Sequence, residues 1–202
     1  MDYLNIEVLT EQADRSAATS AERKRGLSVI ASTVGKRLVM DRWGVPSIVR
    51  SFTWQAWGWQ EIAALRAFIA RRKGRINPVW LCTDNADLVL AKAAQATDDS
   101  IRIKRIAYSQ LVFNTGNGRR HIAVQKKDGT RQMFKVVNCN DNLDGTETLV
   151  LNARLTEPYE AGKHFSYMTL CRLETDEVRL AFTSPQVCEA QLRFLELPKE
   201  TP

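Results

Sequence analysis

Four cysteines and two histidines are the first residues of this chain to consider as metal ligands or catalytic groups. The cysteines stand far apart, and no two of them form a C-x-x-C pair. Structural zinc and iron–sulfur sites usually draw some of their ligands from closely spaced pairs. We therefore expect reduced thiols with no metal and no cofactor, although four cysteines could in principle hold zinc or an iron–sulfur cluster: Cys82, Cys139, Cys171 and Cys188.

The two histidines, His121 and His164, have no second histidine or glutamate at metal-ligand spacing. No serine lies in a G-x-S-x-G elbow, which would present a nucleophile. Asp84 and Asp87 could form a pair of carboxylates, but a polar loop between strands explains them. Because no nucleophile, base and orienting group come together, we expect no enzyme and no catalytic residues. A small hydrolase would require a histidine to meet Asp84 or Asp87 in a pocket.

The segment 140–145 matches the first half of a calcium-binding loop, with Asn140, Asn142 and Asp144 at alternating positions before a glycine. The twelfth position of such a loop holds a bidentate glutamate, and here it is Leu151. The flanking segments also predict strands instead of helices. The pattern therefore favours a hairpin turn.

Tryptophan and arginine gather around one stretch of the chain, residues 51–81. Tryptophans can stack on sugars or bases. They also fill cores, and together with arginine they are enriched at the energetic centres of protein interfaces. We favour core packing and an assembly interface, and the predicted interface residues are Trp54, Trp57, Trp59, Arg71, Arg72 and Arg75.

The chain carries a formal charge of +6 and has a pI of about 9.3, but its basic residues are dispersed in pairs. Only residues 71–75 form a dense basic cluster. Nucleic-acid-binding proteins usually concentrate positive charge on one element. We therefore expect no specific nucleic-acid partner. A nucleic-acid-binding β-domain is the alternative, and it predicts DNA binding that weakens steeply with salt.

The clearest helix signal covers residues 60–73, between an aromatic strand at 51–57 and a strand that begins at Val79. Ile62, Leu65, Phe68 and Ile69 recur at helical spacing and form one apolar stripe. A glutamate stands near the start and three basic residues near the end, which suits the helix dipole. Gly74 then ends the helix.

Most of the remaining chain alternates between apolar and polar residues, which predicts strands. Lys127-Asp128-Gly129 and Asp144-Gly145 predict hairpin turns, and residues 110–113 predict a further strand. Residues 10–26 lack an apolar stripe and predict an exposed arm or a marginal helix. We expect a mainly β (α+β) protein. Residues 1–90 and 166–202 would form a β-sandwich with helix 60–73, and residues 91–165 an inserted β-rich module.

No apolar run approaches the ~20 residues that cross a bilayer, and the acidic N-terminus does not read as a signal peptide. We therefore expect no membrane partner and a soluble protein made in the cytoplasm.

The segment EIAALRAFIARRKGRINPVWLCTDNADLVL resembles a motif of bacteriophage tail-tip proteins. In minor tail, distal tail and upper baseplate hub proteins of long-tailed phages, an aromatic strand leads into a helix that ends in glycine, and a strand with tryptophan follows. Three later segments are similar to tail proteins of Mu-like siphophages and gene-transfer-agent-like particles: GRRHIAVQKKDGTRQMFKVV, GTETLVLNARL and CRLETDEVRLAFTSPQVCEAQLRFLEL. The resemblance covers roughly residues 27–197.

This resemblance implies a structural protein of the virion tail, with a tube-like β-sandwich or barrel and one packed helix. Such proteins form homo-oligomeric rings that link the tail tube to the tail tip, so the implied partners are further copies, the tail tube, the hub and the tape measure protein. Some tail-tip proteins carry an iron–sulfur cluster on four cysteines. The usual Ser or Thr at the helix start is replaced here by Gly58-Trp59.

Overall fold

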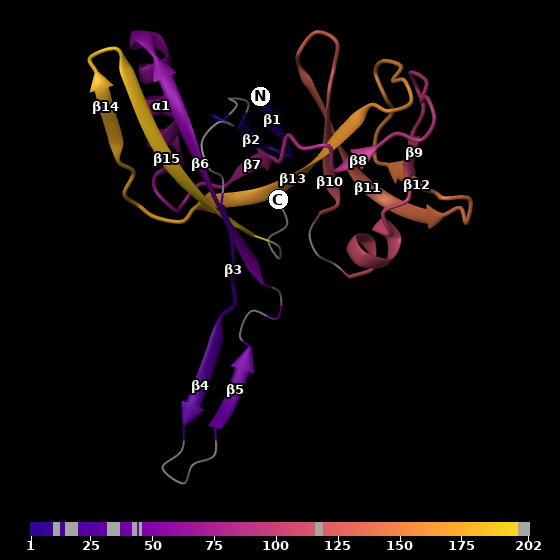
Figure 1. The fold of residues 1–202 in the computed structure, drawn as a ribbon, viewed down its shortest axis with the longest axis horizontal. Coiled ribbons are helices and arrows are strands. Elements are labelled where there is room, and N and C mark those ends of the chain that lie inside the picture. Colours follow the sequence, from indigo (N-terminus) through magenta and orange to yellow (C-terminus); the bar gives the residue numbers. More distant parts are fainter. Residues whose placement is uncertain are drawn as a thin grey trace. The chain divides into compact units, whose positions relative to one another are not determined.

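The computed structural model describes residues 1–9, 13–14, 20–31, 37–41, 44, 46–115 and 119–197. With 51% of residues in strands and 12% in helices, it has one large, mostly antiparallel sheet and a single α-helix. The predicted mainly β class with one helix is therefore confirmed. The described strands do not close into a barrel. The chain divides into two compact units (Figure 1).

Unit 1 comprises Met1, Asn5–Val79 and Leu170–Pro202. Its elements are β2 (Ile6–Leu9), β3 (Ser20–Lys24), β4 (Leu27–Ala31), β5 (Arg37–Asp41), β6 (Ser47–Trp57), α1 (Gly58–Arg72), β14 (Leu180–Ser184) and β15 (Val187–Glu196). Four strands form an antiparallel sheet in the order β14-β15-β6-β3. Strands β4 and β5 form a separate two-stranded sheet.

Unit 2 comprises Asp2–Leu4 and Trp80–Thr169. Its elements are β1 (Asp2–Tyr3), β8 (Leu88–Val89), β9 (Ser100–Lys104), the π-helix η1 (Ser109–Phe113), β10 (His121–Gln125), β11 (Arg131–Asp141) and β12 (Thr146–Leu151). Strand β7 (Val79–Cys82) begins at the end of a unit 1 segment, and β13 (His164–Leu173) passes from unit 2 to unit 1. The strand order is β13-β10-β11-β12-β9.

The predicted insertion, residues 91–165, lies within unit 2. That unit also takes in residues 2–4, 80–90 and 166–169, which the prediction assigned to the sandwich. Unit 1 is thus assembled from two separate segments of the chain, and in its sheet β15 of the later segment pairs with β6 of the earlier one.

Helix α1 spans Gly58–Arg72, close to the predicted 60–73. Ile62 and Phe68 are buried and Leu65 is partly buried, so the predicted apolar stripe is confirmed. In place of a Ser or Thr cap, the Glu61 carboxylate accepts the backbone N–H of Trp57 at 2.8 Å. This bond satisfies a donor that would otherwise lack an intrahelical partner.

The end of α1 requires glycine at position 74, as the sequence predicted. Lys73 has a left-handed conformation, with φ of 48°, and Gly74 follows with φ of 63°. A Cβ added at Gly74 would lie 2.4 Å from Oδ1 of Asp176. A larger residue would therefore strain the backbone and would require the Asp176 side chain to move.

Both predicted hairpin turns are confirmed in unit 2. Strands β10 and β11 pair from Gln125 and Arg131 outward, and Gly129 between them has φ of 83°. Strands β11 and β12 pair on either side of residues 142–145, where Gly145 has φ of 81°. The segment that matched half a calcium loop is therefore a β-hairpin turn.

Two predictions of local structure are wrong. Residues 110–113 belong to the π-helix η1 instead of a strand, because the buried Glu147 carboxylate accepts the backbone N–H groups of Ile106, Tyr108 and Ser109 at 2.9–3.0 Å. Residues 20–24 form strand β3 instead of a mobile arm or helix, because the edge of β6 supplies a hydrogen-bonding partner. The rest of the predicted arm, residues 10–12 and 15–19, lies outside the described residues, as do Trp43 and residues 116–118.

We expect Phe68→Asp to abolish folding of unit 1, because it would place an unpaired charge in the contact between α1 and the sheet, which costs several kcal/mol. Ala67→Asp is the matched control, since this neighbouring side chain is exposed on the same helix. Circular dichroism and urea unfolding of both variants test the prediction. Native-like unfolding of Phe68→Asp would contradict it.

Candidate assembly surfaces

Trp54, one of the predicted interface residues, is buried within unit 1. Its ring packs edge-on against Phe194 with centroids 5.8 Å apart, and against Phe52 at 5.7 Å. The indole N–H of Trp54 is buried without a hydrogen-bond partner among the described residues. An unsatisfied buried donor costs ~1–3 kcal/mol, so this N–H calls for an explanation.

Trp57 and Trp59 are exposed, at 62% and 66% of their surface. They flank Gly58, where β6 passes into α1 and the backbone N–H of Gly58 donates to Gln186 at 2.7 Å. This bond fixes the start of α1 against the turn between β14 and β15. Two large, exposed aromatic side chains therefore lie at a fixed corner of unit 1. Interface hot spots are often residues of this kind.

Arg72 is buried, with only 4% of its surface exposed. Its guanidinium forms an ion pair with Glu7 on β2 and donates to the carbonyl oxygen of Pro78 at 2.6 Å. Arg71 also pairs with Glu7, at 2.8 Å. Although burial opposes ionisation of Glu7, these two guanidinium groups lower its pKa below the ordinary value. Arg72 therefore joins the N-terminal strand to the end of α1 inside the unit.

Arg75 lies beyond the end of α1 and is mostly exposed. Its side chain pairs with Asp176 at 3.0 Å, and its backbone N–H donates to the same carboxylate at 3.0 Å. Of the six predicted interface residues, Trp54 and Arg72 are thus internal. Trp57, Trp59, Arg71 and Arg75 are exposed, and their role in assembly stays a prediction.

The hairpin formed by β4 and β5 is a second exposed surface, and sequence reasoning missed it. Its strands pair in register from Leu27 with Asp41 to Ala31 with Arg37. Five of its large apolar side chains are 51–58% exposed: Leu27, Val29, Leu38, Val39 and Met40.

These apolar side chains lie on both faces of the hairpin. The cross-strand pair Val29 and Val39 shares one face with Leu27, and Leu38 and Met40 lie on the other. An isolated two-stranded hairpin is marginally stable in water. A hairpin that is apolar on both faces gains stability when another surface covers it. The contiguous apolar run 38–40 within a short strand was the signal available in the sequence.

Two strand edges of unit 1 are also open. In the described part of the chain, β3 pairs only with β6, and β14 pairs only with β15. Four of the five residues of β14 are exposed. Unpaired edges offer backbone donors and acceptors to another chain.

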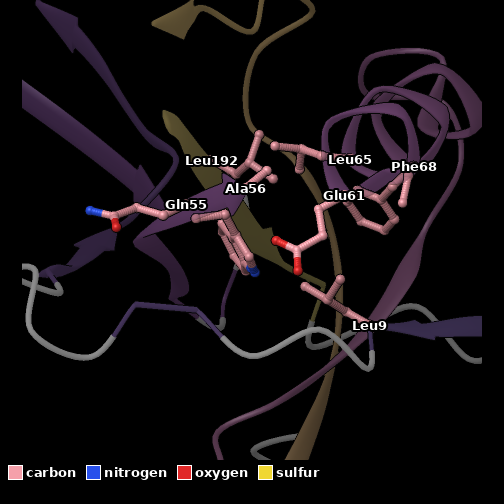
Figure 2. A pocket seen from close by; sticks show the side chains of 9 residues that line it. Leu9, Gln55, Ala56, Glu61, Leu65, Phe68 and Leu192 are labelled. Carbon is pink, nitrogen blue, oxygen red and sulfur yellow. The ribbon is translucent and has the colours of Figure 1, made fainter. Parts of the chain in front are cut away.

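A pocket of about 310 Å³ lies between α1 and the sheet of unit 1 (Figure 2). Its lining is mostly apolar: Leu9, Trp54, Ala56, Ala64, Leu65, Phe68 and Leu192, together with Gln55 and Glu61. Figure 2 shows the Glu61 carboxylate on the side of the pocket near Leu9, whereas the Gln55 amide points away. Among the described residues of the lining, Glu61 is the only charged one.

None of the four cysteines forms a disulfide, and Cys82, Cys171 and Cys188 are buried. Burial raises the pKa of Cys82 to about 11 and that of Cys139 to about 12, so both thiols are protonated at neutral pH. The described residues contain no group of three or more His, Cys, Asp or Glu side chains that could hold a metal ion.

The residues considered for a hydrolase have structural contacts in unit 2. Asp84 pairs with Arg131 at 2.8 Å, and Asp87 accepts the backbone N–H of Tyr167 at 2.8 Å. The Nδ1 of His121 lies 3.0 Å from the Tyr3 hydroxyl, and its ring packs 4.6 Å from that of Trp80. The hydrogen bond between Tyr3 and His121 joins the short strand β1 to the rest of unit 2.

Arg119 and Arg120, one of the dispersed basic pairs, also have partners within the chain. Arg120 lies over the Phe113 ring at 4.4 Å and donates to the carbonyl of Phe113 at 3.0 Å. Arg119 lies over the Tyr167 ring at 5.6 Å. Their guanidinium groups therefore support the packing of η1 and β13.

No protein-family model matches the chain, and no curated protein is similar to it at a significant level. The resemblance to phage tail proteins therefore stays a prediction from the quoted motifs. Among the described residues, no helix combines the length and the apolar character that crossing a membrane demands.

We expect Arg72→Met to destabilise unit 1 by ~3 kcal/mol or more, because it leaves the Glu7 carboxylate half-buried without its closest cation. Arg75→Met is the matched control and should cost less than ~1 kcal/mol, since both partners of its ion pair are mostly exposed. Urea unfolding of the two variants measures the difference. Equal stabilities would show that the Glu7 contact is unimportant.

We expect the stability of unit 2 to fall as the pH decreases from about 6.5 to 4. Burial, aided by Lys135, lowers the pKa of His121 to about 4, whereas a histidine in the unfolded chain has a pKa of about 6.5. The unfolded chain therefore binds more protons within this window, and acid favours unfolding. His121→Gln should flatten this pH dependence, and the exposed His164→Gln should retain it. Urea unfolding of both variants between pH 4 and 7, followed by circular dichroism, tests the prediction.

Proposed function

We propose that this protein is a structural component of the distal tail of a long-tailed bacteriophage, where copies of it form a ring that links the tail tube to the tail tip. The observation that carries the proposal is the β4–β5 hairpin with its five exposed apolar side chains. Such a surface is characteristic of a chain that works in an assembly. The resemblance to tail-protein motifs suggests that this assembly is a phage tail.

The geometry of unit 1 supports a ring in particular. A ring needs two different surfaces on each subunit, one that meets the preceding copy and one that meets the next. The unit offers several such surfaces: the hairpin, the exposed pair Trp57 and Trp59, and the open edges of β3 and β14. Trp is also among the residues most often found at interface hot spots.

The alternative of a nucleic-acid-binding domain has less support. Arg71, Arg72, Arg75, Arg119 and Arg120 contact carboxylates, carbonyl groups or aromatic rings of the same chain. Binding phosphates would require several of these contacts to break. A ring subunit can keep all of them.

The hairpin supplies the test. In the hairpin variant, Val29→Lys and Val39→Glu replace the apolar pair on one face, and Leu38→Thr and Met40→Thr replace the apolar residues on the other. The new charges face each other across the strands, and threonine favours strands, so the hairpin itself should persist. We expect this variant to fail to restore infectious particles when it complements a phage that lacks the gene.

Leu143→Lys is the matched control, because Leu143 is 86% exposed on a turn of unit 2. It should complement normally. Electron microscopy of the lysates should show the hairpin variant arrested before complete tails form, with soluble, folded protein present. Wild-type levels of infectious particles with the hairpin variant, or particles that lack the wild-type protein, would overturn the proposal.

A further inference from the structure

The pocket between α1 and the sheet of unit 1 has the chemistry of a site for a peptide segment. Its walls are apolar, with Leu65 and Phe68 on α1 and Leu192 on β15. At about 310 Å³, it lies at the lower end of the volumes of ligand pockets. Within the described lining, the charged side chain is Glu61 on α1.

Trp54 gives an independent sign that the pocket has an occupant. This residue lines the pocket and is only 6% exposed, yet its indole N–H has no hydrogen-bond partner among the described residues. Buried donors in native proteins nearly always have an acceptor. A ligand with both an apolar group and a carbonyl oxygen would cover the walls and satisfy this N–H.

The β4–β5 hairpin of another copy has these properties. It offers apolar side chains on both faces and, because β4 and β5 pair only with each other in the described chain, backbone carbonyl groups along its outer edges. Arg25, next to the hairpin, is 61% exposed at its side chain, and its guanidinium forms a long ion pair of 4.0 Å with Asp41. This charge complements Glu61 in the pocket.

We infer that the pocket receives the β4–β5 hairpin of a second copy of this chain, which rests on the proposed ring function and deepens it. An apolar side chain of the hairpin fills the pocket, and a backbone carbonyl of the hairpin accepts the Trp54 N–H. Hairpin and pocket are different surfaces of one chain. In a ring this contact is head-to-tail, and it repeats from copy to copy until the ring closes.

Two variants provide the test: one lacks the apolar hairpin surface, and the other lacks the open pocket. The hairpin variant defined above keeps the pocket, and Ala64→Trp fills the pocket but keeps the hairpin, because Ala64 is an exposed helix residue at the pocket wall. Alone, each should self-associate at least ~30-fold more weakly than the wild type, as expected for a lost hot spot. Mixed, they should form a one-to-one dimer and nothing larger, because one intact hairpin meets one intact pocket. Sedimentation and native mass spectrometry of the full-length chains measure this.

Trp54→Phe adds a second measurement. It removes the N–H and keeps an aromatic ring, so the isolated chain should remain folded, although the smaller ring leaves a cavity in the core. Self-association should weaken by about three- to tenfold, because the hydrogen bond to the second copy is lost. Leu143→Lys is the control in every measurement and should behave as the wild type.

Several results would overturn the inference. They are normal self-association of Ala64→Trp, failure of the two variants to complement each other, a wild-type chain that stays monomeric at millimolar concentration, or a small molecule found in the pocket. A different result would contradict the proposed function itself, namely tails that do not contain the wild-type protein. If Ala64→Trp restores infectious particles and the hairpin variant does not, the ring function stands and the hairpin docks elsewhere.

Discussion

The pairing of β6 with β15 is the interaction on which unit 1 depends. Nine residue pairs join these strands, from Trp57 with Val187 to Val49 with Leu195. Their helix-facing residues Ala56 and Cys188 form the floor on which Ile62 of α1 packs. The ladder also aligns the corner at Gly58 and supplies both strands that border the pocket. Each exposed surface of unit 1 that we associate with assembly, except the hairpin, is therefore positioned by contacts between the two ends of the chain.

Local signals in the sequence predicted the local structure well. The apolar stripe, the glutamate near the start and the glycine at the end located α1 to within two residues. Glycines following aspartates located two hairpin turns, because such turns need residues with positive φ. The predicted aromatic strand was also present but longer, as β6. These features depend on neighbours in the sequence, which is why periodicity and turn residues reveal them.

Features that depend on distant partners were not predictable in this way. Arg72 was expected at a surface because it belongs to a basic cluster, but Glu7 and the Pro78 carbonyl hold it inside. Glu147 read as an ordinary polar residue of a strand, yet its buried carboxylate organises η1. Strand β3 has little apolar character and forms because β6 offers an edge. In each case the deciding contact joins residues tens of positions apart, so no local pattern records it.

The split of unit 1 between the two ends of the chain has a consequence for biosynthesis. When α1 and β6 leave the ribosome, β15 has not yet been made, and more than a hundred residues of translation separate them. At about 5–20 residues per second, this interval lasts several seconds or more. Unit 2 is complete in the meantime and can fold first. Until β15 is made, the apolar stripe of α1 lacks part of the surface on which it packs. The nascent chain is thus most prone to aggregate during the stage just before β15 emerges.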